Sequence, residues 1–388
     1  MNVRKQITTF LLITLIGLGI WSVPPPPGID QKAIHLIAIF VFTILGIIFK
    51  AMPMGGMAFL ALVLLTMTKT LTFAEAFSGF NHHIVWLIVF AFFIARGFIK
   101  TGLGERIAYM LMRLLGSSAL GMGYGMALTD LFLAPAIPSV TARIGGVLYP
   151  VVSSLSRGFE SEPHNKPRRL GAFLIMVAFQ GSLITSAMFL TSMAGNPLIA
   201  NLAKEMGVTL SWGSWALAGL APGLMCLACT PLILYKIYPP ELKEMPEAKA
   251  YATQKLAELG SLRREEWIMI VTFVLLLILW IIGPAISLSA TVTALLGLSI
   301  LLLSRVLSWD DIVSEKGAWN ILIWFSVLLM MASFLTTMGL TTWFSGWVAG
   351  KISIQNWMPA FLLLSLVYFY SHYFFASNLS HIRSMFPP

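Results

Sequence analysis

The chain has 388 residues, of which 58% are hydrophobic and 11% are charged. A soluble domain is about 45–50% apolar and about 25% charged, so this composition excludes an ordinary soluble protein and predicts an all-α polytopic membrane protein. The net charge of +9 does not indicate a nucleic-acid partner, because the cations cluster in short loops between apolar runs.

Apolar runs predict most of the helices in chain order. The first run follows a basic start, but no small-residue cleavage site precedes Pro24, so we interpret segment 1–32 as a retained N-terminal helix. Residues 104–116 place Arg106 and Arg113 seven positions apart on one helical face, which suits a helix in the membrane interface. The spanning helices are expected at about 7–23, 33–49, 54–71, 83–100, 213–236, 267–283, 289–304, 319–338 and 357–375.

Residues 129–155 break the rules for a simple spanning helix, because prolines and glycines interrupt them and two charges, Asp130 and Arg143, lie among them. Backbone that leaves the helix inside hydrocarbon must be buried in protein or line a watery cavity. We therefore predict a re-entrant hairpin. Its tip consists of Ser139, Val140 and Thr141, and a second such tip, Ser377, Asn378 and Leu379, follows 238 positions later.

Two further segments are expected to be irregular or polar. The helix at about 170–203 contains Gly195 and Asn196 followed by a proline, which predicts a broken helix. Residues 239–266 form a polar linker, in which an amphipathic helix should start at Pro246 and end at Gly260.

The distribution of Lys and Arg predicts the orientation. With the N-terminus in the cytoplasm, most of these cations fall in loops on the inner side, as the positive-inside rule requires. We expect a multi-pass protein of the bacterial cell inner membrane.

Weak similarity at a steady offset indicates an internal repeat. Residues 71–80 resemble 307–316 at an offset of 236, and residues 85–103 resemble 322–340 at 237. We interpret 33–238 as a first repeat and 267–388 as a second one. An odd number of crossings in the first copy would invert the second, which is the architecture of secondary transporters. The second hairpin breaks off at the end of the chain, so we expect a C-terminally truncated second repeat.

Four segments carry a resemblance to a known family: PSVTARIGGVLYPVVSSL, TSMAGNPLIANLAKEMG, PPELKEMPEAKAYATQKLAELG and SHYFFASNLSHIRSMFPP. They resemble the divalent anion:sodium symporter family, in particular its 2-oxoglutarate/malate, citrate/succinate and tartrate/succinate translocators. The resemblance implies a homodimer with elevator-type alternating access. It also implies di- or tricarboxylate substrates, moved by sodium symport or by exchange.

The family's hallmark is a Ser-Asn-Thr triplet at each hairpin tip, and this chain departs from it at Val140 and Leu379. Carried over by position, the substrate-binding candidates are Ser139, Val140, Thr141, Ser377, Asn378, Leu379 and Arg143. Arg143 could attract the anion or pair with a neighbour such as Asp130. The cation-binding candidates are Ser139, Gly195, Asn196, Ala376 and Asn378, with Na⁺ as the coupling ion and no other cofactor expected.

Other functions are weighed against transport. A transport-inactive remnant is the alternative hypothesis, and it rests on Val140, Leu379 and the truncation. An enzyme is not expected, because the titratable residues are scattered among loops without a nucleophile–base or metal arrangement. Cys226 and Cys229 are interpreted as small packing residues rather than a redox pair.

Overall fold

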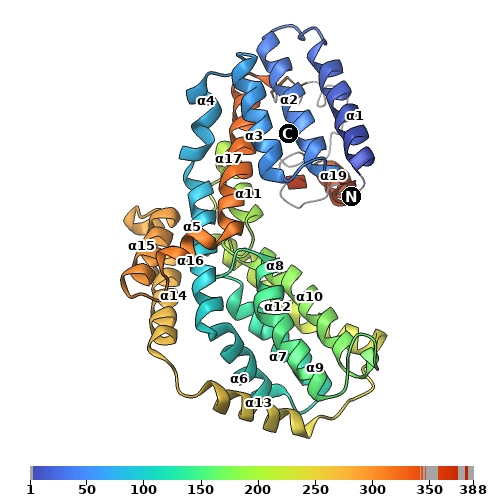
Figure 1. The fold of residues 1–388 in the computed structure, drawn as a ribbon, viewed down its shortest axis with the longest axis vertical. Helices are drawn as coiled ribbons and strands as arrows, with labels where there is room; N and C mark the ends of the chain where they lie inside the picture. The colour runs from blue at the N-terminus through green and yellow to red at the C-terminus, as the bar shows by residue number, and fades with distance from the viewer. Residues whose placement is uncertain (1–2, 341, 344–345, 347–356, 375–380, 383–388) are drawn as a thin grey trace. The chain divides into compact units, whose positions relative to one another are not determined.

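The computed structural model describes residues 3–340, 342–343, 346, 357–374 and 381–382. The regular elements in these ranges are helices (Figure 1), which confirms the all-α prediction. Among the described residues, six helices are long and apolar enough to cross a membrane. They are α2 (Gln31–Ile48), α5 (His83–Thr101), α10 (Gly171–Met188), α12 (Trp212–Ile237), α14 (Arg264–Ile282) and α17 (Lys316–Thr337).

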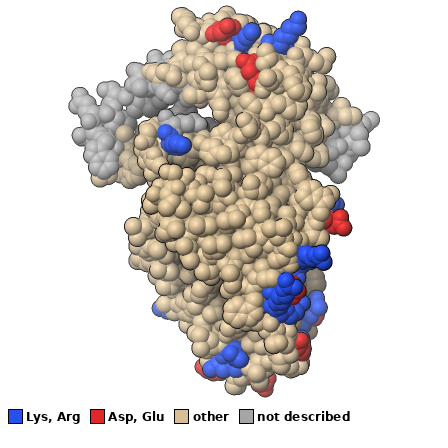
Figure 2. All heavy atoms as spheres, turned by 90° about the vertical axis from the view of Figure 1, so that its left-hand side faces the viewer, with Lys and Arg blue, Asp and Glu red and all other residues tan. Residues whose placement is uncertain are grey.

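The surface fits a polytopic membrane protein. Figure 2 shows a face that is mostly free of charge, with Lys, Arg, Asp and Glu gathered in separate patches. Helix α12 is a clear case, since only 17% of its apolar window is buried inside the protein. Large side chains such as Leu217 and Met225 are more than two thirds exposed on it, as expected of a helix whose outer face meets lipid.

The chain divides into two compact units. Unit 1 comprises the described residues of 1–86 and 317–388, and unit 2 comprises residues 87–316. Unit 1 holds α1 (Val3–Trp21), α2, α3 (Met54–Met67), α4 (Phe73–Phe77), η1 (Ser78–Asn81), nearly all of α17, α19 (Trp357–Ser371) and η5 (His372–Phe374).

Close helix approach in unit 1 depends on glycine. A Cβ on Gly46 of α2 would lie 2.2 Å from the Met57 side chain of α3. A Cβ on Gly79 of η1 would lie 2.0 Å from the carbonyl oxygen of Ser326 in α17. The second contact is with backbone, which cannot turn aside, so η1 can lie this close to α17 only because residue 79 lacks a side chain.

Unit 2 has one main apolar core. It is formed by α6 (Leu103–Leu115), α7 (Ala119–Leu133), α9 (Tyr149–Gly158), α10, α12 and α13 (Pro246–Leu259). Phe173 lies fully buried in it. Helix α13 begins at Pro246 and is followed by Gly260 at φ 69°, so both predicted ends of the linker helix are confirmed.

Arg106 departs from the prediction for α6. The sequence placed Arg106 and Arg113 together on an interfacial face, but only Arg113 is exposed. Arg106 is buried, and its Nε donates to Glu266 Oε1 of α14 at 2.6 Å. Its Nη1 donates to the carbonyl of Gly260 at 2.8 Å, so the side chain joins α6 to the end of the linker helix. The interfacial interpretation is therefore wrong for Arg106, because a carboxylate remote in sequence neutralises it.

Local structure recurs at the offset seen in the sequence. Helix α3 of unit 1 has its counterpart in α15 (Ala290–Leu303) of unit 2, with both ends shifted by 236 residues. A residue with positive φ follows each helix, Lys69 at 55° and Arg305 at 61°. The next helices, α4 and α16 (Trp309–Ser314), both start with a capping box. The mutual inversion of the two copies remains a prediction.

Candidate functional site

The first hairpin (residues 119–158) lies in unit 2 and is longer than its predicted core. Its first arm is α7. Its second arm runs without interruption through α8 (Val140–Arg143), the π-helical segment η2 (Ile144–Leu148) and α9. The two arms are joined by a short turn that contains Pro135 and Pro138, neither of which has an N–H to offer a helix. Proline thus fixes where the first arm ends.

The hairpin tip (residues 138–141) starts a new helix. Ser139 has extended backbone geometry, and its Oγ accepts the N–H of Ala142 at 3.2 Å, so it is the N-cap of α8. Ser139 and Val140 are half-buried and Thr141 is exposed. The first N–H groups of a helix have no partner within the helix, so hydroxyl and amide donors gather at this tip.

The second arm widens to a π-helix for a local reason. Pro150 cannot donate to a carbonyl in the preceding turn, and its ring would clash there in a regular α-helix. The chain instead closes a wider turn, in which the Tyr149 N–H donates to the Ile144 carbonyl. Gly145 and Gly146, which are both exposed, lie inside this turn.

Arg143 is fully buried, and each nitrogen of its guanidinium donates hydrogen bonds within the protein. Its Nε donates to Asp130 Oδ1 of α7 at 2.9 Å, which bears out the pairing weighed from the sequence. Its Nη1 donates to the carbonyls of Ile137 and Ser192, both at 2.7 Å. Its Nη2 donates to the Ser182 carbonyl at 3.1 Å and to Thr185 Oγ1 at 3.3 Å.

A guanidinium has five N–H donors, and these five contacts use all of them. Thr185 also donates to the second oxygen of Asp130. The ion pair therefore ties the two arms of the hairpin to α10, and in this conformation Arg143 has no N–H left for a substrate.

The helix break (residues 189–194) separates α10 from α11 (Gly195–Glu205). Polar side chains bond the carbonyls that the break frees. Ser192 Oγ donates to the Ser186 carbonyl at 2.6 Å, and Asn196 Nδ2 donates to the same carbonyl at 2.7 Å. Gly195 and Asn196 are buried in the first turn of α11, so the interruption ends just before them rather than at them.

Two bonds hold the hairpin turn against the helix break. Arg143 reaches the Ser192 carbonyl, and Thr191 Oγ1 donates to the Pro135 carbonyl at 2.7 Å. Thr191 also accepts the indole N–H of Trp212 at 3.1 Å. The structure thus joins the segment that carries Ser139 to the segment that precedes Gly195 and Asn196.

The remaining predicted site residues are Ala376, Ser377, Asn378 and Leu379, and they lie outside the described residues. Sequence reasoning gave no role to the bond between Thr191 and Pro135. The available signal was a Thr-Ser pair two residues before a Gly-Asn-Pro sequence, since such hydroxyls are suited to bond carbonyls that leave a helix.

Comparison with known proteins gives consistent findings. A family model described as the sodium:sulfate symporter transmembrane region matches residues 4–388. The chain is 52% identical over 356 residues to YflS of Bacillus subtilis (strain 168). The aligned residues make up 91% of this chain and 74% of that protein.

Two further relatives also have names that state a substrate. The chain is 46% identical over 386 residues to the chloroplastic dicarboxylate transporter 1 of Spinacia oleracea, covering 98% of this chain and 68% of that protein. It is 32% identical over 408 residues to the citrate/succinate antiporter of Escherichia coli (strain K12), covering 100% of this chain and 84% of that protein.

Proposed function

The chain belongs to the sodium:sulfate symporter family, and we infer that it is a membrane transporter of di- and tricarboxylates such as 2-oxoglutarate, malate, succinate and citrate. The observation that carries this inference is the similarity to a named dicarboxylate transporter over 98% of the chain. The family is one of transporters and not of enzymes.

The hairpin tip is where we expect one end of the substrate. The hydroxyls of Ser139 and Thr141 and the first N–H groups of the helix that starts at Val140 can donate to a carboxylate. Asp130 cancels the charge of Arg143, so this group of donors does not include a buried unpaired cation. A carboxylate held by these neutral donors can also be released, as turnover requires.

A sodium ion is the coupling ion that we propose next to the tip. Ser139, Gly195 and Asn196 are its candidate ligands, because carbonyl and side-chain oxygens at an unwound helix suit Na⁺. The amide nitrogen of Asn196 donates to the carbonyls of Ser186 and Phe189, which leaves its amide oxygen for another role. Ala376 and Asn378 would contribute to a second site. Symport with Na⁺ and exchange of two carboxylates are separate outcomes of the transport assay below.

The larger architecture is also part of the proposal. We expect two inverted repeats, elevator-type movement, a homodimer, and a cytoplasmic N-terminus in the inner membrane of a bacterium. The recurrence of α3, α4 and their caps at an offset of 236 residues supports the repeat. The concentration of Lys and Arg in the loops assigned to the inner side supports the orientation.

The second candidate is a chain that inserts into the membrane but does not transport. Val140 favours it, because a half-buried apolar side chain stands at the tip where an amide could bind both carboxylate and cation. The substitution Val140→Asn separates the two candidates. A native chain that already transports as well as the Asn variant would exclude the inactive one.

The main test uses the purified full chain in liposomes. Labelled 2-oxoglutarate, malate, succinate or citrate is added outside, either with unlabelled dicarboxylate inside or with an inward Na⁺ gradient. We expect uptake that depends on one of these conditions. Thr141→Val should weaken it, whereas Thr253→Val, at an exposed threonine of the linker helix α13, should not. If the folded chain takes up none of the four substrates under either condition, the proposed function is wrong.

A further inference from the structure

Arg96 is an arginine within the membrane-spanning helix α5 that no carboxylate neutralises. Among the described residues, no Asp or Glu forms an ion pair with it, and its buried Nε has no hydrogen-bond partner. Its side chain is half-buried. A charge inside a membrane helix is costly, and such residues commonly mark a substrate or ion pathway.

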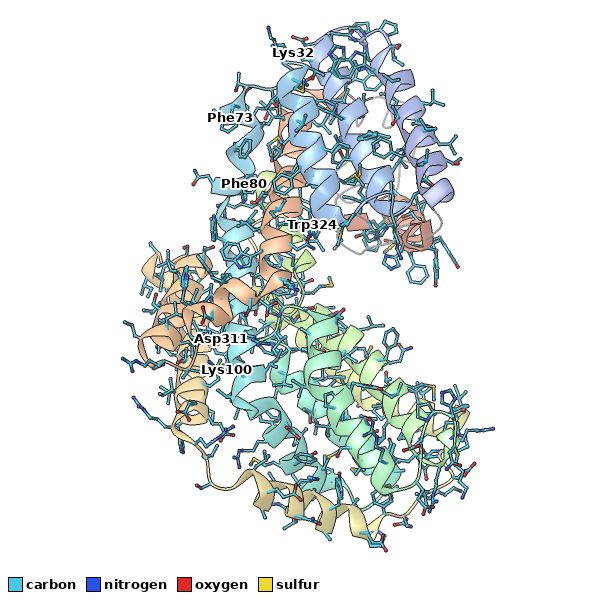
Figure 3. The ribbon with its side chains drawn as sticks, in the orientation of Figure 1. Lys32, Phe73, Phe80, Lys100, Asp311 and Trp324 are labelled. Carbon is cyan, nitrogen blue, oxygen red and sulfur yellow. The ribbon has the colours of Figure 1, made fainter. Side chains whose placement is uncertain are left out.

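Unlike Arg96, three other cations of unit 2 form ion pairs with carboxylates. Lys100, one turn later on α5, lies 2.5 Å from Asp311 of α16 (Figure 3). Arg106 and Arg143 are both paired with buried carboxylates. The difference is not explained by burial alone, since Arg96 is more buried than the exposed Lys100.

The packing of α5 shows where Arg96 lies. Ile99 contacts the second arm of the first hairpin, because its Cδ1 is 3.1 Å from the position that a Cβ would take on Gly146. Arg96 precedes Ile99 by three residues, so it occupies the same face about 4.5 Å closer to the helix N-terminus. Side chains on a helix also lean toward its N-terminus.

The direction of the two helices places Arg96 toward the hairpin tip. In Figure 1, α5 leads down the page to α6, and the second arm of the hairpin leads down from α8 to α9. Because they run the same way, moving from Ile99 back to Arg96 corresponds to moving from Gly146 back toward α8. Arg96 is therefore on the part of α5 that is nearer to α8, at whose start Thr141 lies.

The surface of the hairpin at this level leaves room for a ligand. Thr141 is exposed, and among the described residues no atom from outside the same helical turn lies within 4 Å of the position that a Cβ would take on Gly145. Arg143 cannot serve a ligand there, because all five of its N–H donors are bonded within the protein. The hydroxyl of Thr141 and the charge of Arg96 are both available to an anion in this region.

We propose that Arg96 binds a carboxylate of the transported substrate beside the hairpin tip, a role that rests on the function proposed above. A guanidinium matches a carboxylate with two parallel N–H donors. The substrates carry two or three negative charges, and the pair of Asp130 and Arg143 contributes no net charge. Arg96 supplies the positive charge from a second helix, and its partial exposure allows the anion to leave.

The test compares Arg96→Gln and Arg96→Lys with Arg113→Gln, which removes an exposed arginine of α6. Uptake by the full chain in liposomes is measured over a range of substrate concentrations. R96Q should raise KM about tenfold to a hundredfold, the loss expected for a hydrogen bond to a charged group, without lowering the maximal rate. R96K should recover part of the affinity, because an ammonium keeps the charge but not the planar fork. R113Q should match the native chain.

Unchanged KM in R96Q would overturn the proposal, and so would a lower maximal rate at unchanged KM. If the native chain transports no carboxylate, the proposed function fails as well, whereas normal transport by R96Q defeats only this inference.

A second measurement needs no variant, in case R96Q does not fold. Phenylglyoxal modification of Arg96 in the native chain is followed by mass spectrometry with and without malate. Protection by malate supports the proposal. Equal modification in both samples, or none in either, overturns it.

Discussion

Substitution of Asp130 by alanine tests the ion pair that holds the first hairpin together. The side chains of Asp130 and Arg143 are 1% and 0% exposed, and Oδ1 lies 2.9 Å from Nε. Without the carboxylate, a charged guanidinium remains buried and loses the acceptor of its Nε. Thr185 loses an acceptor at the same time. We therefore expect D130A to destabilise the protein strongly.

The magnitude follows from comparison with a surface pair in the same unit. Glu160 and Arg169 are 2.7 Å apart, but the Glu160 side chain is 71% exposed. Removing one partner of a buried pair costs about 3–5 kcal/mol, whereas an exposed pair contributes about 0–1 kcal/mol. The free energy of unfolding should thus fall by at least about 2 kcal/mol more in D130A than in E160A.

The assay is unfolding of the full chain in mild detergent by titration with sodium dodecyl sulfate, followed by circular dichroism. The double variant D130A/R143M leaves no unpaired charge, so it should regain part of the stability that D130A loses. It should not regain all of it, because the carbonyls of Ile137, Ser182 and Ser192 lose the donors that Arg143 provides.

Equal losses in D130A and E160A would refute the reasoning, since burial would then not matter to the pair. A double variant less stable than D130A would also contradict it. In that case the carbonyl contacts of Arg143, rather than its pairing with Asp130, would hold the hairpin.

Three further predictions use the same titration. Thr191→Val removes the hydroxyl that donates to the hairpin turn and should lower the free energy of unfolding by about 1–3 kcal/mol. Thr191→Ser keeps a hydroxyl and should restore the stability. Equal stability of the Val and Ser variants would exclude a role for this hydrogen bond. For Asp311, burial raises the pKa, but the hydrogen bonds from Lys100 and from the N–H and hydroxyl of Ser308, together with the charge of Lys100, lower it more in sum, and the pKa falls from 3.8 to about 2. Because the folded pKa is depressed, the ion pair stabilises the fold above pH about 4 and loses this effect as the pH falls through about 2. Asp311→Asn should therefore be less stable than the native chain by about 1–2 kcal/mol at pH 7, and most of this difference should be gone at pH 2. Gly79→Ala places a Cβ 2.0 Å from a backbone oxygen of α17 and should lower the free energy of unfolding by about 1–3 kcal/mol or more. Gly19→Ala is the control and should be neutral or stabilising, because a Cβ at this position meets no atom of another segment within 4 Å among the described residues. Equal effects of the two substitutions would contradict the close approach of η1 to α17.

Much of the first hairpin could be predicted from the sequence. Pro135 and Pro138 end its first arm because proline removes a donor wherever it stands. The start of that arm at Ala119 could not be placed, because residues 119–128 carry no charge or proline that sets them apart from a spanning helix. Its extent depends on packing against α6 and α10.

The site was only partly accessible to sequence reasoning. Ser139 was identified as a tip residue, and the structure shows it as a helix cap. The pairing of Arg143 with Asp130 was one of two open alternatives, and the choice between them depends on how the two arms face each other. The predicted exposure of Arg106 was wrong, because the carboxylate that pairs with it belongs to Glu266, 160 positions later in the sequence.

The sequence by itself determined the membrane class, the helix positions, the tip of the hairpin and the recurrence of local structure at a steady offset. These features depend on the transfer free energy of each residue and on backbone preferences that act over a few positions. The tertiary structure alone decided which of four cations in unit 2 are neutralised. Lys100, Arg106 and Arg143 each meet a carboxylate, and Arg96 meets none within the described part of the chain, because an ion pair requires two charges from distant parts of the chain to lie within about 4 Å.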